Sequence, residues 1–269
     1  MRPITICLIN QKGGCGKSST CFHLAGDLAQ SGVRVLLVDA DPQGSLSQGF
    51  FGAERIERLE PRETLAALFQ EELVPAPKAL CVATPFDGIH ILPANQHLAA
   101  HNGPCPETTG LRQYLLESCL SSLTNFDVAL IDCPPNLYAC SWNALLAADF
   151  VLIPVPPEDF GTQGLRPVHQ AIDNARLLNP RLTLLGHLVT RSDRRLLIHQ
   201  AYEQKLRDLY GASVLETVIP EASAFKVALA CRQPVSYCSP RSKAACAMRR
   251  LVSEISERAG IHQIQERTV

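Results

Sequence analysis

Short apolar runs alternate along the chain with longer stretches in which apolar residues recur every three or four positions. The short runs are typical of buried strands, and the amphipathic stretches are typical of helices. The strands expected on this basis are 4–9, 34–39, 89–92, 127–132, 150–155, 183–189 and 214–219. The helices expected are 17–31, 107–123, 139–147, 162–178, 197–210 and 243–259. This alternation predicts an α/β fold in which a mostly parallel, twisted sheet is covered by helices on both faces.

Two segments interrupt the alternation. Residues 51–80 are charged and contain prolines, so we expect a peripheral insertion there, and residues 103–106 (Gly-Pro-Cys-Pro) are expected to form a loop. The sequence contains no internal repeat, low-complexity tract or obvious linker. We therefore expect a single domain over residues 1–269, with residues 243–260 forming a C-terminal helix.

The composition narrows the class of protein. A chain of 269 residues with 46% hydrophobic content can bury the core of one sizeable α/β domain. No apolar run reaches membrane-spanning length, and a strand directly after Arg2-Pro3 argues against a signal peptide. Eleven cysteines without a C-x-x-C pair favour reduced thiols in a cytoplasmic protein over disulfides or zinc. His97, His101 and Cys105 lack further ligand spacing, so we expect no metal site there.

The net charge of −1 hides an uneven distribution. Residues 1–190 carry 12 basic and 18 acidic side chains, whereas residues 191–269 carry 13 basic and 8 acidic ones. The C-terminal third is therefore the candidate surface for a polyanion. Ordinary variation of surface charge remains the alternative interpretation.

Residues 11–18 carry the most specific chemical signal. They read Gln-Lys-Gly-Gly-Cys-Gly-Lys-Ser, after an expected strand and before an expected helix, which is the context of a phosphate-binding loop. Glycines let the backbone N–H groups face an anion, and the N-terminus of the helix adds to the attraction. The residues expected to bind the nucleotide here are Gly13, Gly14, Cys15, Gly16, Lys17, Ser18 and Ser19.

The loop departs from the usual G-x-x-x-x-G-K-[ST] pattern at its start. Gln11 occupies the place of the first glycine, and Lys12 adds a second lysine. Lys17 is expected to reach the β- and γ-phosphates, and the Ser18 hydroxyl to bind Mg²⁺. The pattern alone does not explain Lys12.

Acidic and polar residues follow three of the expected strands. Asp39 and Asp41 come after one apolar run, Asp132 after another, and Thr190-Arg191 after a third. Ligands of open α/β sheets bind at the carboxyl ends of the strands. Asp132 resembles a Walker B carboxylate that supports Mg²⁺. Asp39 and Asp41 are expected to divide the metal shell and the attacking water between them, although a capping role for Asp39 is the alternative.

These motifs resemble the ParA/MinD family of P-loop ATPases over nearly the whole chain. The resemblance rests on residues 12–18, on Asp39-x-Asp41-Pro42-Gln43 and on Asp132-x-Pro134-Pro135, with further similarity to the ParA branch in segments 142–145, 153–155 and 219–220. It implies an ATP-dependent sandwich dimer that uses ATP and Mg²⁺. It also implies roles for individual residues: Lys12 crosses to the partner's phosphates, Lys17 binds phosphates within its own chain, Ser18 binds the metal and Asp132 supports it, Asp41 positions the water, and Thr190, Arg191, Ile219 and Pro220 hold adenine. The expected metal residues are therefore Ser18, Asp132 and, from its position after the strand, Asp39.

Members of the ParA branch bind DNA without sequence preference when they are dimeric. The same resemblance implies that basic residues near the C-terminal region contact phosphates here: Arg195, Lys226, Arg241, Lys243, Arg249 and Arg250. The chain departs from many members after Ile219-Pro220, where Glu221 and Ala224 replace arginines. Despite this departure, the resemblance makes a nucleoid-associated partition ATPase the leading hypothesis. Its cargo would be a plasmid, a chromosome or a protein body, released when a ParB-like or other adaptor protein stimulates hydrolysis.

Two other classes of function are open. A MinD-like membrane-cycling ATPase would need an amphipathic C-terminal helix, but residues 248–260 lack Phe and Trp and carry Glu254 and Glu257. We expect this helix to pack on the domain rather than to anchor it stably in a membrane. The third class is an enzyme that uses the fold for amidation or ligation, and the sequence shows no glutaminase-like Cys/His set.

Overall fold

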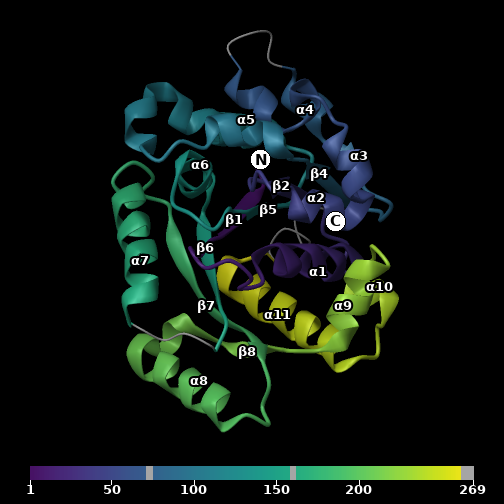
Figure 1. Cartoon of the computed structure of the whole chain (residues 1–269), viewed down its shortest axis with the longest axis vertical. Helices are drawn as coiled ribbons and strands as arrows, with labels where there is room; N and C mark the ends of the chain where they lie inside the picture. The colour runs from purple at the N-terminus through teal and green to yellow at the C-terminus, as the bar shows by residue number, and fades with distance from the viewer. Residues whose placement is uncertain (71–74, 158–161, 262–269) are drawn as a thin grey trace.

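An eight-stranded sheet forms the centre of the part of the protein that the structure describes (Figure 1). The computed structural model describes residues 1–70, 75–157 and 162–261. The strand order is β3-β4-β2-β5-β1-β6-β7-β8, and all neighbouring pairs are parallel except β3 with β4. The strands are β1 Ile4–Leu8, β2 Val35–Asp39, β3 Val82–Ala83, β4 Ile89–Leu92, β5 Val128–Asp132, β6 Phe150–Val155, β7 Thr183–Ser192 and β8 Val214–Pro220.

Helices cover both faces of the sheet, which explains why the central strands are almost continuously apolar. One core lies between the sheet and α1, α2, α9, α10 and α11, and the other between the sheet and η2, α5, α6, α7 and α8. The α-helices are α1 Lys17–Gln30, α2 Ser45–Phe51, α3 Ala53–Glu57, α4 Pro77–Leu80, α5 Leu115–Ser122, α6 Ala139–Ala147, α7 Thr162–Arg176, α8 Leu197–Tyr210, α9 Ser223–Ala230, α10 Val235–Cys238 and α11 Lys243–Ala259. The 3₁₀ helices are η1 Pro61–Glu63, η2 Leu65–Phe69, η3 Gln96–His101, η4 Pro106–Tyr114 and η5 Gly211–Ser213.

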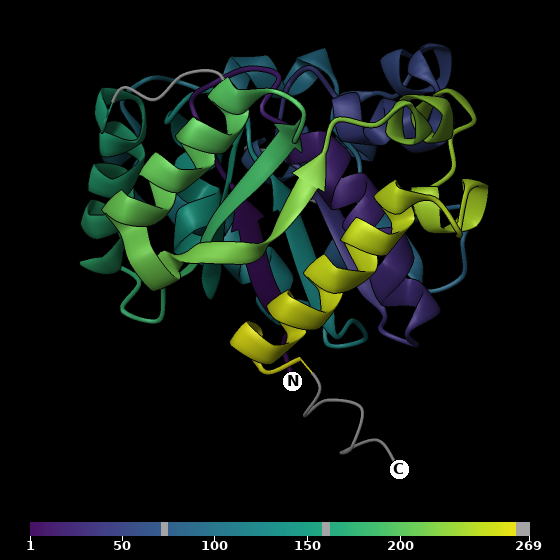
Figure 2. The same ribbon diagram turned by 90° about the horizontal axis from the view of Figure 1, so that it is seen from below.

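The C-terminal helix α11 lies across the sheet beside α1 and β8 (Figure 2). Ser242 caps its first turn, where the hydroxyl accepts from the backbone N–H of Ala245 at 3.1 Å. Gly260 ends the helix with φ = 67°, a conformation that favours glycine. Between these ends its apolar face, including Met248 and Leu251, is buried against the domain. The expectation of a packed C-terminal helix is therefore confirmed.

All seven expected strands are present, and the fold class is confirmed. The short edge strand β3 was not expected, because two residues carry no detectable alternation. The helix expected over 107–123 is wrong in its first half: residues 106–114 form η4, in which Gly110 has φ = 59° and ψ = −130°, and the α-helix begins only at Leu115. Glycine tolerates this backbone conformation and interrupts the helical ladder there.

The segment 51–80, expected as a peripheral insertion, includes part of the core. The side chains of η1 are exposed or partly exposed, but all five residues of η2 are buried, as is Leu80 at the end of α4. Residues 71–74 of this segment lie outside the described residues. The charged residues around η2 obscure its apolar run in the sequence.

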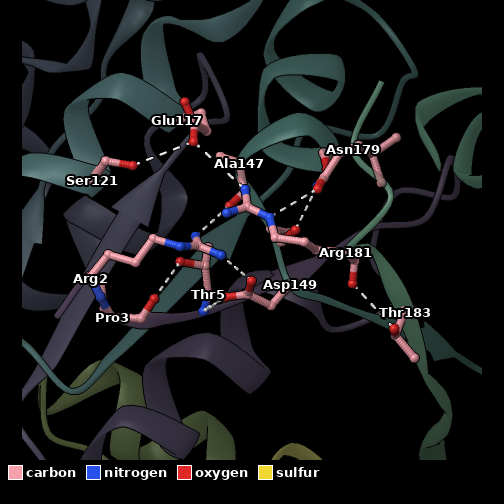
Figure 3. Close-up of polar contacts among 12 residues, drawn as sticks. Arg2, Pro3, Thr5, Glu117, Ser121, Ala147, Asp149, Asn179, Arg181 and Thr183 are labelled. Carbon is pink, nitrogen blue, oxygen red and sulfur yellow. Dashed lines mark hydrogen bonds and ion pairs between the residues drawn. The ribbon is translucent and has the colours of Figure 1, made fainter. Parts of the chain in front are cut away.

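Polar contacts fix the edge of the sheet at which the strands begin (Figure 3). The Arg2 guanidinium pairs with Asp149 and donates to the Ala147 carbonyl at 3.4 Å. Nearby, Arg181 donates to the Asn179 side chain at 3.3 Å and pairs with Glu117 at 3.6 Å. These contacts tie the connections around β6 together and leave the opposite edge, where the parallel strands end, for a ligand.

Candidate nucleotide site and basic groove

The loop between β1 and α1 has the backbone conformation of an anion-binding turn. Gly14 and Gly16 have φ of 71° and 92°, values that a side chain would disfavour. Gly16 is the N-cap of α1 and offers no side-chain cap, so the first turn of this 14-residue helix keeps its N–H groups available to an anion. The glycines thus make the local geometry that the sequence predicted.

Lys17 lies at the floor of this loop and is 7% exposed. Its amino group donates to the carbonyl oxygens of Asn10 at 3.1 Å and Lys12 at 3.2 Å, and it lies 3.7 Å from the Cys15 sulfur. These neutral acceptors hold the ammonium in the loop, where phosphate oxygens would be stronger partners. The position fits the predicted contact with phosphates.

The residues expected to bind the cofactor surround one cavity of about 470 Å³. The phosphate-binding loop forms one end, and Thr190, Arg191, Ile219 and Pro220 form the wall beyond it. All eleven residues predicted to bind the nucleotide line this cavity, and Asp41 lines it as well. Lys12 is not among the lining residues, although residues 13–20 directly after it are.

The carboxyl end of β7 is bonded directly to the phosphate-binding loop. The Thr190 hydroxyl donates to the Cys15 carbonyl at 2.8 Å, and the Arg191 guanidinium donates to the Gly14 carbonyl at 3.1 Å. Arg191 has φ = 54°, an uncommon value for a residue with a side chain. These bonds take up two loop carbonyls and so leave the N–H side of the loop to face the cavity.

Sequence reasoning missed the apolar part of the cavity wall. Phe22, Phe225 and Leu229 line it, together with Glu221 and Lys226. Phe225 lies on α9, a helix of only eight residues that was not expected. Aromatic and aliphatic side chains beside a phosphate loop provide a surface on which a flat base can pack.

Asp39 and Asp132 are register partners on β2 and β5, and both are fully buried. Burial raises the pKa of Asp39 to about 7, and burial together with the Asp39 charge raises the pKa of Asp132 well above its usual range. Both oxygens of Asp132 lack a hydrogen-bond partner among the described residues. Burying an ionised carboxylate without a partner costs free energy, so a cation bound beside Asp132 would stabilise its ionised form.

The neighbourhood of Asp132 fits Mg²⁺. The hydroxyl of Ser18 lies close enough to lower the pKa of Asp132, and hydroxyl and carboxylate oxygens are the ligands that this ion prefers. Ser18 and Asp132 are therefore the residues placed to hold the metal, directly or through water. Lys17 also lowers the pKa of Asp132 and supplies part of the charge balance.

Asp39 is engaged differently from its predicted metal role. Its Oδ2 accepts from the Ser47 N–H at 2.8 Å and from the Ser47 hydroxyl at 2.7 Å. Its Oδ1 accepts from the N–H of Asp41 at 3.2 Å. These bonds anchor the loop and α2 after β2, so the capping interpretation describes Asp39 better than metal ligation does.

Asp41 is held at the cavity by this loop. It is 9% exposed, and its Oδ1 accepts from the Gln43 N–H at 2.9 Å, which forms a tight side-chain turn. Its carboxylate therefore stands at the phosphate end in a fixed orientation, as the predicted water-positioning role requires.

A second, basic groove of about 760 Å³ adjoins the nucleotide cavity. Four of the six residues expected to contact DNA line it: Arg195, Arg241, Lys243 and Arg250. Arg194 also lines the groove. The sequence analysis missed it, because Arg194 lies in a loop and the sequence does not show toward which surface a loop side chain points. Arg195 is paired with Asp193 at 2.7 Å, and this pairing lowers the pKa of Asp193 to about 2.

The other two residues expected to contact DNA lie elsewhere. Arg249 donates to the Pro240 carbonyl at 2.9 Å and to the Cys246 sulfur at 3.1 Å. Lys226 lines the nucleotide cavity and pairs with Glu221 at 2.9 Å. Neither residue lines the basic groove, so the structure does not bring these two together with the other four.

The chain is similar to proteins that partition chromosomes. A family model described as an AAA domain matches residues 4–184. The chromosome-partitioning ATPase Soj of Thermus thermophilus is 38% identical over 94% of this chain and 95% of Soj. The chromosome partitioning protein ParA of Caulobacter vibrioides is 33% identical over 94% of each chain.

Solved structures show the same architecture. A cobyrinic acid a,c-diamide synthase from Mycobacterium smegmatis with bound ADP and magnesium is 30% identical, has a TM-score of 0.77, and is matched over 94% of this chain and 93% of its own. An McdA variant of Cyanothece in complex with ATP has a TM-score of 0.80 over 96% and 97% of the two chains at 21% identity, which shows a shared fold. The fold, the nucleotide cavity and the similarity to these proteins together define a P-loop ATPase. The chain belongs to the ParA/MinD family of these enzymes, in its ParA branch.

Proposed function

We propose that the protein is a partition or positioning ATPase in which ATP and Mg²⁺ control binding to DNA. The observation that carries this proposal is the contact between the two sites. Pro220 and Glu221, at the end of β8, line both the nucleotide cavity and the basic groove. A change at the nucleotide site therefore has a short route to the surface that would bind a polyanion.

The side chains divide the hydrolytic task. The loop N–H groups and Lys17 would bind the phosphates, and Ser18 and Asp132 would hold Mg²⁺, which would neutralise part of the phosphate charge. Asp41 orients the attacking water. Lys12, which lies on the loop but does not line its own cavity, supplies a cation to the partner's phosphates when two protomers close over their strand ends.

Dimer closure would place two basic grooves on one particle. Phosphate contacts by Lys and Arg release counterions from DNA, and their number sets how steeply affinity falls with salt. One protomer offers few such contacts, so pairing raises affinity by making two sets act together. An adaptor protein that stimulates hydrolysis would return the protein to the weakly binding state and release a plasmid, chromosome or protein cargo.

Asp41→Ala tests the dimer part of this cycle. If Asp41 positions the water, the variant binds ATP but does not hydrolyse it, so an ATP dimer accumulates. We expect light scattering coupled to gel filtration to give twice the monomer mass with ATP and the monomer mass with ADP. A monomer under both conditions, with ATP shown to be bound, would rule out the proposed switch.

The membrane and amidation alternatives find less support. The apolar face of α11 is covered by the domain, and within the described residues no helix is long and apolar enough to cross a membrane.

The M. smegmatis neighbour, a diamide synthase, points to ATP-dependent amidation as the other alternative. Among the described residues that line the cavity, however, the only thiol is that of fully buried Cys15, whose pKa is raised by burial. A buried, protonated thiol is a poor nucleophile for glutamine hydrolysis.

A further inference from the structure

Glu221 stands on the nucleotide cavity wall with its carboxylate held from two sides. Its backbone N–H donates to the Ser192 carbonyl at 3.0 Å, which ties the end of β8 to the end of β7. One side-chain oxygen accepts from Arg191 at 3.1 Å, and the other pairs with Lys226 at 2.9 Å. The side chain is 34% exposed, so it remains accessible from the cavity.

The two basic partners keep this carboxylate ionised. Lys226 and Arg191 lower the pKa of Glu221 below its ordinary value. An ionised carboxylate only accepts hydrogen bonds, and its two oxygens offer about four acceptor positions. Since each oxygen has one partner here, each retains capacity for another donor.

The distance to the phosphate-binding loop is bridged by one side chain. The Arg191 guanidinium donates to the Gly14 carbonyl through Nη1 and to Glu221 through Nε. Glu221 is thus one guanidinium beyond the loop, on the wall that continues to the apolar residues Ala222 and Phe225. Glu221 therefore lies between the phosphate-binding loop and the apolar part of the wall. In a nucleotide, the ribose lies between the phosphates and the base in the same way.

The chemistry of the ligand then selects its partner. Ionised phosphates offer only hydrogen-bond acceptors, and so does an ionised carboxylate, so the two cannot hydrogen-bond to each other. The ribose offers two adjacent hydroxyl donors, which match the free acceptor capacity of one carboxylate. We propose that Glu221 binds the 2′- and 3′-hydroxyls and makes the site selective for ribonucleotides over deoxyribonucleotides. This inference rests on the proposed ATP site.

The test compares the dissociation constants of ATP, 2′-deoxy-ATP and 3′-deoxy-ATP with Mg²⁺. A hydrogen bond to a charged group supports a preference of the wild-type protein for ATP of roughly tenfold or more over each deoxy form. In Glu221→Ala the affinity for ATP should fall to that for the deoxynucleotides, so the preference disappears. Glu216→Ala, which removes an exposed carboxylate from the same strand, should change neither value.

The ratio of affinities separates recognition from a structural role. If Glu221 only positions Arg191, Glu221→Ala weakens ATP and both deoxynucleotides equally, and the unchanged ratio overturns the inference. A wild-type protein that binds ATP without preferring it also overturns the inference and leaves the proposed function intact. Absence of ATP binding altogether removes both.

Discussion

Two aspartates with similar sequence signals have different surroundings. Asp39 and Asp132 both end apolar strands and face each other in the sheet register. Asp39 is satisfied by Ser47 and by the backbone of Asp41, whereas Asp132 has no hydrogen-bond partner among the described residues. The sequence predicted that acids gather at this sheet edge. It did not distinguish their roles, because Ser47 lies on a helix that its pattern did not reveal.

Replacing each aspartate by asparagine separates these roles. Asp132→Asn replaces a buried carboxyl group whose ionised form is disfavoured by burial and by the Asp39 charge, so the free energy of unfolding without nucleotide should stay the same or rise. Its Mg²⁺-dependent ATP hydrolysis should be lost. Asp39→Asn weakens the bonds from Ser47 and should lower the free energy of unfolding by about 1–3 kcal/mol. Urea unfolding and a phosphate-release assay give both readouts. Equal destabilisation by the two changes would contradict the assignment.

Lys12 is the residue whose predicted role needs a second protomer. The Lys12→Ala variant should bind ATP normally but lose hydrolysis, because in the wild-type dimer Lys12 acts on the phosphates bound by the partner. Mixing Lys12→Ala with Asp41→Ala before ATP is added tests the direction of action. A mixed dimer has one complete site, so random pairing should restore about a quarter of the wild-type rate. No recovery on mixing, with mixed dimers shown to form, would indicate that Lys12 acts within its own chain.

At the scale of elements, the orientation of α11 about its own axis determines which of its basic residues face the basic groove. Successive residues of a helix point about 100° apart. Arg250 therefore lies in the basic groove, while Arg249 contacts Pro240 and Cys246. The amphipathic pattern predicted the helix and its buried face. It did not fix the groove, which also needs the loop after β7 and the end of β8.

Arg250 and Arg249 provide a matched pair for the DNA surface. Arg250→Gln should weaken binding of the ATP state to DNA and reduce the slope of log affinity against log salt by about 0.9 for each phosphate that the protein no longer neutralises. Arg249→Gln removes an equal charge from the next position and should leave the slope unchanged. Fluorescence anisotropy on a short duplex at several salt concentrations measures both. Equal effects of the two substitutions would place DNA outside the groove.

At the scale of the whole molecule, the carboxyl ends of β7 and β8 join the two sites. In Figure 2 both strands run toward the same edge, with α11 crossing beside them. Thr190 and Arg191 bond the phosphate-binding loop from this edge, and Arg194 and Arg195 follow a few residues later in the basic groove. The sequence predicted the sheet, the loop and the family. The adjacency of the two sites comes from long-range packing and could not be read from local patterns.

The most direct test of a nucleotide-controlled DNA binder is the affinity for a non-specific duplex with ATP, with ADP and without nucleotide, each across a range of salt. The adjoining sites predict strong binding only with ATP and Mg²⁺, and a steep fall in affinity as salt rises. Equal affinity with ATP and ADP, or an affinity that salt does not change, would contradict the proposal that the nucleotide site controls the basic groove.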